Sequence, residues 1–146
     1  MSFQWIQMRI SEEKDRRKRE TATLERLPLA LEDVHLSLVA CVEAYQKAFA
    51  AEAVTIHLHT SRIRAIVREE VDGKWQQTAR VEVTLIPTLP GLQIDHGNGA
   101  EPVLIEIGLL PGDKLFYRDR VNDQYVTMEE LTRRILDRAL FPKLGE

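Results

Sequence analysis

The stretch from Arg62 to Ile86 constrains the fold most, because it has the pattern of two β-strands joined at Asp72-Gly73. Side chains alternate between the two faces of a strand. In the second strand, the residues that share a face with Val81 are mostly apolar, whereas those that share a face with Arg80 are polar. The stretch therefore predicts an antiparallel hairpin with one buried face and one polar face.

The apolar faces of the two strands coincide only if paired residues have index numbers with an even sum, and a two-residue loop would break this. We therefore expect a three-residue loop, Val71-Asp72-Gly73, with Gly73 as a bulge. Arg62 then faces Glu82, and Arg64 faces Arg80. Because like charges in direct opposition are destabilising, we expect a carboxylate or a bound anion between Arg64 and Arg80, unless the face is simply solvated.

The N-terminal part has three features. Residues 2–10 fit either an edge strand or a helix start, and Phe3 and Trp5 are expected to dock on the domain or on a second copy. Ser11 fits a helix cap. The run Arg16–Arg19 lies in a stretch without apolar residues, which favours a solvated helix over a nucleic-acid patch. Residues 1–27 are thus expected to form a partly solvated arm.

A stripe of apolar residues at spacings of three and four follows the arm. Pro28 disfavours helix at the residue before it but suits a first helical position, so the main helix is expected over residues 28–51. Packing on the protein's own sheet is favoured over a dimer seam, and Cys41 is expected to be a small buried hydrophobe. The stripe comprises Leu24, Leu27, Leu31, Val34, Leu38, Cys41, Tyr45 and Ala48.

Further strands and a final helix complete the predicted order. Residues 53–120 are expected to form an antiparallel meander of about five strands, and residues 127–141 a helix capped by Thr127 and Glu130. We predict one two-layer α+β domain over residues 1–146, with the helices on one face of the sheet.

Composition limits the function. The chain has 146 residues, 29% of them charged, and a net charge of −3, which argues against a dedicated nucleic-acid binder. One cysteine excludes an internal disulfide and suits a cytoplasmic location. No apolar run is long enough to span a membrane.

The residue types leave three functions open. The favoured one is a non-enzymatic, self-associating protein-interaction module, with interface candidates Phe3, Trp5, Leu24, Leu27, Leu31 and Val34. The second is a binder of an anionic ligand, or an enzyme, that uses Arg64, Arg80, Glu82, His57, His59 and Arg118. The third is nucleic-acid binding through the basic run. The sequence indicates no catalytic constellation, cofactor or metal site.

Overall fold

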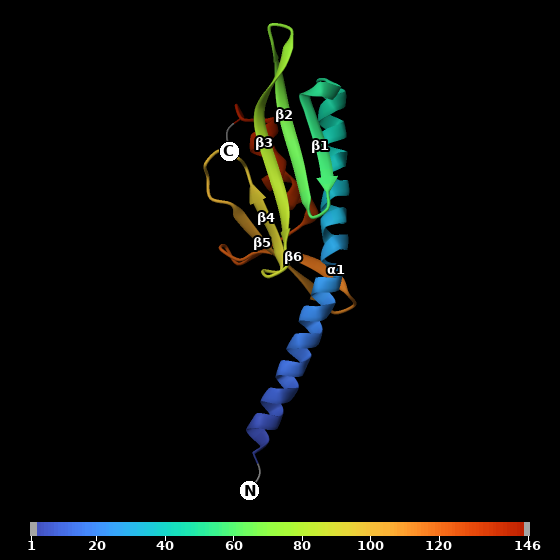
Figure 1. The fold of residues 1–146 in the computed structure, drawn as a ribbon, viewed down its shortest axis with the longest axis vertical. Coiled ribbons are helices and arrows are strands. Elements are labelled where there is room, and N and C mark those ends of the chain that lie inside the picture. Colours follow the sequence, from blue (N-terminus) through green and yellow to red (C-terminus); the bar gives the residue numbers. More distant parts are fainter. Residues whose placement is uncertain (1–2, 145–146) are drawn as a thin grey trace.

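Two helices cover one face of an antiparallel sheet in the computed structural model, which describes residues 3–144 (Figure 1). The α+β class and the two layers are confirmed. Residues 1–2 of the expected arm and residues 145–146 lie outside the described residues. The helix α1, Gln4–Ala48, and the helix α2, Met128–Leu140, bracket all the strands in the sequence.

The helix α1 is one continuous helix of 45 residues, so the expected break at Pro28 and the expected start at Ser11 are wrong. Residues 4–10 are helical, which excludes the edge strand. A proline inside a helix removes one backbone hydrogen bond. Here Thr23 and Leu27 before Pro28, and Ala30 after it, are all buried on the same side, so core packing holds the helix together across the proline.

The sheet has seven strands in sequence order, rather than the five expected. Each strand pairs with the next one, as in a meander. The last strand was missed because it has only three residues, too few to show an alternating pattern. The strands are β1 Val54–His59, β2 Arg62–Val71, β3 Lys74–Ile86, β4 Gly91–Asp95, β5 Val103–Leu110, β6 Lys114–Asp119 and β7 Gln124–Val126.

The register and the loop of the β2–β3 hairpin differ from the prediction. Val71 pairs with Lys74 across a two-residue loop, in which Asp72 and Gly73 have φ of 53° and 78°, as a type I′ turn requires. The register shifts at Val67/Arg68, where Thr78 is the extra residue on β3. The predicted bulge at Gly73 is therefore wrong.

The shift at Thr78 restores the even sum in the body of the hairpin, where Ala65 pairs with Val81. Arg64 consequently pairs with Glu82 and not with Arg80. Beyond the bulge, Trp75 pairs with Glu70 and is exposed, although its parity predicted that it would share the buried face.

The core lies between the helices and the inner face of the sheet. Val81, Ala65 and Ile105 are buried there, as are Leu131 and Ile135 of α2. The N–H of Glu130 donates to Thr127 Oγ1 at 3.1 Å, which confirms Thr127 as the cap. The carboxylate of Glu130 lies 3.4 Å from Arg134 Nε instead of completing the predicted capping box. The opposite face of the sheet is polar and carries the predicted arginines.

Candidate interaction surfaces

The first candidate surface is the projecting half of α1, Gln4–Thr21, called the arm below. In Figure 1 it runs away from the sheet with no other element beside it, and Thr23 is the first buried residue of the helix. Trp5 and Met8 are 66% and 64% exposed. Phe3, Ile6 and Ile10 are exposed as well, so the free end of the arm is an apolar tip in contact with water.

Ion pairs stabilise the middle of the arm. Glu13 Oε1 lies 2.7 Å from Arg16 Nη2 and 3.1 Å from Arg17 Nε. Hydrogen bonds from these two guanidinium groups lower the pKa of Glu13 to about 2. Arg16 also pairs with Glu20. Two members of the basic run Arg16–Arg19 are thus neutralised within the helix.

The apolar stripe divides at the point where α1 leaves the domain. Leu27, Leu31 and Val34 are buried against the sheet, which is the intramolecular packing that the sequence favoured, whereas Leu24 is 39% exposed. Cys41 is exposed and Val42 is buried in its place, so the prediction for Cys41 is wrong. The reason is geometric. An α-helix has 3.6 residues per turn, so positions that follow a strict seven-residue repeat move gradually away from the buried side of the helix.

The second candidate surface is the uncovered face of the sheet, where Glu82 lies among arginines. Arg64 Nε donates to Glu82 Oε1 at 3.0 Å. Arg62 and Arg80 each approach the same carboxylate to 3.7 Å. Glu82 has only 17% of its side chain exposed. Of the groups expected between Arg64 and Arg80, the structure therefore shows a carboxylate, that of Glu82.

The two histidines lie beside this cluster without forming a metal site. His57 pairs with Arg64 and His59 with Arg62 across β1 and β2, and both histidines are exposed. Among residues 3–144, no group of three or more histidine, cysteine, aspartate and glutamate side chains is placed to hold a metal ion.

Arg118 belongs to a separate cluster on the same face. It lies 3.7 Å from Glu106 Oε1 and 3.3 Å from Asp123 Oδ1, and Arg120 approaches Glu106 to 3.6 Å. The strand β4 lies between β3 and β5 and separates this cluster from Glu82. The structure thus brings Arg64, Arg80 and Glu82 together but leaves Arg118 apart.

A buried carboxylate, Asp119, was missed by the sequence reasoning. It is 4% exposed, and its Oδ2 accepts hydrogen bonds from Arg134 Nη1 at 2.7 Å and Asn122 Nδ2 at 2.9 Å. Burial raises the pKa of Asp119, but the hydrogen bonds, chiefly from Asn122 and Arg134, outweigh it and lower the pKa overall. Asp119 lies two positions after the buried Tyr117 on β6 and therefore shares its face of the sheet, and this alternation could have predicted the burial of Asp119.

None of these groups forms an evident catalytic arrangement. The pKa of Tyr117 is raised to about 12 by burial and by the charge of Asp33, and its hydroxyl donates to the carbonyl of Ala30 at 3.4 Å. That hydrogen bond ties β6 to α1. The perturbed side chains Glu13, Tyr117 and Asp119 are therefore all explained by structural contacts.

Comparison with known proteins gives no relative: no protein-family model, no curated protein and no solved structure matches the chain. Of the helices in residues 3–144, neither is both long and apolar enough to cross a membrane.

Proposed function

We propose that the chain is a non-enzymatic protein-interaction module that self-associates through its arm. The observation that carries the proposal is the apolar tip of the arm, the part of α1 that has no other element of the described chain beside it. Most helical stability in proteins comes from the packing of an apolar face, and exposed large apolar side chains gain free energy when they are covered. A partner that covers the tip supplies both.

A second copy fits the arm because of the order of residues along it. Phe3, Ile6 and Ile10 recur at spacings of three and four and share one side of the helix. In an antiparallel pair of arms that places Glu13 beside Arg17 of the second copy, Ile6 lies opposite Leu24, because both pairs have the same index sum. Opposite charges then meet in the middle and apolar residues meet at both ends.

The energy of such a pair is adequate. Covering three large apolar side chains from each copy contributes on the order of 10 kcal/mol before the entropic cost of association is subtracted. Closed two-fold dimers are the commonest oligomers, and an antiparallel pair of identical helices has this symmetry. The exposed Cys41 suits the cytoplasm, the location that we propose together with this function.

The oligomeric state tests the proposal. Light scattering at concentrations well above micromolar is expected to give the mass of a dimer for the full chain. Ile6→Glu and Leu24→Glu are each expected to shift the protein to monomer by at least a tenfold rise in Kd. Val121→Glu is the matched control, because Val121 is an apolar residue 87% exposed outside the arm. A monomeric full chain, or equal effects of all three substitutions, would contradict the proposal.

The second candidate function rests on the three arginines around Glu82. An organic anion could displace or join that carboxylate on the open face. Thermal-shift screening of organic anions and metal ions tests this function. A specific shift that Arg80→Ala abolishes would support it, and a flat screen would count against it.

A further inference from the structure

The strand β3 has an open edge in the middle of the sheet. On one side it pairs with β2 from Lys74 onward, but on the other side β4 pairs only with Glu82–Ile86. Within the described residues 3–144, the segment Lys74–Val81 therefore has a strand neighbour on one side alone. The loop after β4 closes this edge at Arg80, whose carbonyl lies against Gly97, and the remaining open part, Lys74–Ala79, matches an additional strand of about six residues.

Backbone groups on this edge point into the open space. The N–H of Leu85 donates to the carbonyl of Ser61 on the β2 side, and alternation directs the backbone N–H and C=O of Arg80 the opposite way. Beyond the bulge the alternation restarts at the closing pair Val71–Lys74, which directs the backbone of Gln77 the same way. The carbonyl of Arg80 meets Gly97 of the loop after β4, so the backbone N–H and C=O of Gln77 are the groups that the edge offers to an extended chain.

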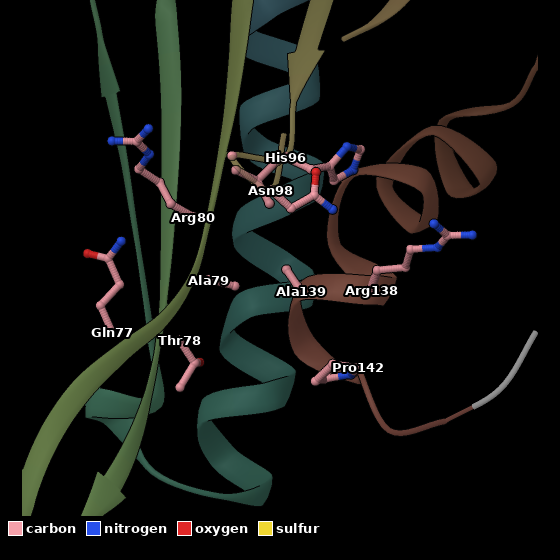
Figure 2. A pocket seen from close by; sticks show the side chains of 11 residues that line it. Gln77, Thr78, Ala79, Arg80, His96, Asn98, Arg138, Ala139 and Pro142 are labelled. Carbon is pink, nitrogen blue, oxygen red and sulfur yellow. The ribbon is translucent and has the colours of Figure 1, made fainter. Parts of the chain in front are cut away.

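A groove of about 530 Å³ runs beside this edge, between β3, the loop after β4 and the end of α2. Small side chains form its inner wall, with Ala79 on β3 and Ala139 on α2 (Figure 2). Figure 2 also shows Arg80 and Gln77 pointing away from α2, toward the uncovered face of the sheet. An added strand would therefore place alternate side chains in a small apolar groove and beside Arg80.

The charges around the groove select the occupant. Among the described residues, the lining of the groove includes Arg80 but no carboxylate, and Arg80 shares the single carboxylate of Glu82 with two further arginines. Arg80 contacts Glu82 only at 3.7 Å, and Asp95 accepts a hydrogen bond from the N–H of Gly97. Pairing with the β3 edge of a second copy, centred on Gln77, would set Arg80 against Lys74, and like charges in direct opposition are unfavourable. An acidic extended chain is complementary where a second copy is not.

We propose that the open edge of β3 binds an extended segment of another protein in which apolar and acidic side chains alternate, adding it to the sheet as a strand. The apolar side chains occupy the groove beside Ala79 and Ala139, and the acidic side chains lie next to Arg80. This site does not use the arm. Deleting residues 2–21 would therefore remove self-association and leave strand addition intact.

Selection from a display library of random octapeptides tests the proposal on the full chain. We expect enrichment of peptides in which aspartate or glutamate alternates with valine, isoleucine or leucine. The best peptide is then measured by fluorescence anisotropy against the full chain and its variants. Arg80→Glu is expected to weaken binding at least tenfold, while Arg120→Glu, on the same face but in the Glu106 cluster, leaves binding within twofold.

The backbone contribution needs a variant without a change of charge. Gln77→Pro removes an N–H that points into the open space and spares the ladder to β2, so it is also expected to weaken binding at least tenfold. Circular dichroism verifies that it remains folded. In the complex with the peptide, amide exchange at Gln77 is expected to slow at least tenfold in the otherwise unchanged chain.

Three outcomes would overturn the proposal. They are the absence of an enriched pattern, enrichment of basic peptides, and binding that is indifferent to Arg80→Glu. Slow amide exchange at Gln77 in the peptide-free protein that appears only as concentration rises would assign the edge to a second copy instead.

Discussion

At the scale of single residues, the contact between Asp119 and Arg134 matters most for stability. It joins the end of β6 to α2. Arg134 Nη1 lies 2.7 Å from Asp119 Oδ2, and the carboxylate of Asp119 is buried. A buried ion pair adds little net stability compared with apolar packing, but removing one partner leaves the other uncompensated. The pair therefore anchors α2 against the sheet.

Asp119→Ala is expected to lower the free energy of unfolding by about 3 kcal/mol, because Arg134, Asn122 and the N–H of Val121 all lose the buried carboxylate to which they donate hydrogen bonds. Denaturant titration measures this loss. Asp137→Ala, which removes an exposed carboxylate 3.9 Å from Arg133, is the control and is expected to change stability by less than about 0.5 kcal/mol. Equal losses for the two variants would contradict the assignment.

The same pair predicts a pH dependence. The pKa of Asp119 is lowered in the folded protein. Its ionised form therefore contributes stability that is fully present above the unfolded pKa, about 3.9, and is lost as the pH falls through the folded pKa. The difference in unfolding free energy between the unchanged chain and Asp119→Ala is expected to be constant from about pH 5 to 8 and to shrink below about pH 4. A difference that grows on acidification would contradict this sign.

At the scale of elements, Pro28 shows where local preference yields to packing. An interior proline costs a helix about 3 kcal/mol, which is why the sequence favoured a helix boundary there. Buried residues on both sides of Pro28 lie on one side of α1, and their packing outweighs that cost. A local sequence signal cannot reveal this balance, because the stabilising contacts come from strands far along the chain.

Pro28→Ala is accordingly expected to stabilise the protein, by up to about 3 kcal/mol, because it restores a backbone hydrogen bond at an exposed position. Urea titration measures the gain. Pro142→Ala, beyond the end of α2, is the control and is expected to have little effect. A loss of stability in Pro28→Ala would mean that the proline contributes to packing.

The hairpin shows both what a sequence contains and what it does not. Parity correctly predicted that Ala65 and Val81 face the core and that Arg64 and Arg80 face outward. Asp72-Gly73 correctly predicted the place of the turn, but not its two-residue length. Reconciling the two required an extra residue in one strand, and Thr78 carries no local signal for a bulge as Gly73 does. The choice depends on the tertiary packing of both faces.

At the scale of the whole molecule, the arm and the sheet domain are independent in their contacts. The cluster around Glu82 and the aliphatic inner face could be predicted from alternation alone. The continuous arm could not, because residues 14–20 have no apolar periodicity to indicate that the helix continues. The salt bridges of Glu13 and the core beyond Thr23 support it instead.

Deleting residues 2–21 is expected to leave the domain folded, with a thermal midpoint within a few degrees of that of the full chain, because the side chains of residues 3–21 lie outside the core. Differential scanning calorimetry on dilute, monomeric protein measures this. The deletion of residues 127–144 is the contrasting control, since it removes α2 and should prevent cooperative folding. A large fall in the midpoint of the arm deletion would show that the arm contributes to the domain.

The projecting arm also has a hydrodynamic consequence. At 1.5 Å per helical residue it extends roughly 27 Å beyond the domain. Such a rod raises friction without adding much mass. Gel filtration calibrated with spherical standards would therefore report too large a size even for a single chain. The number of chains in the particle has to be determined by methods that measure mass, such as light scattering, and not from an elution volume.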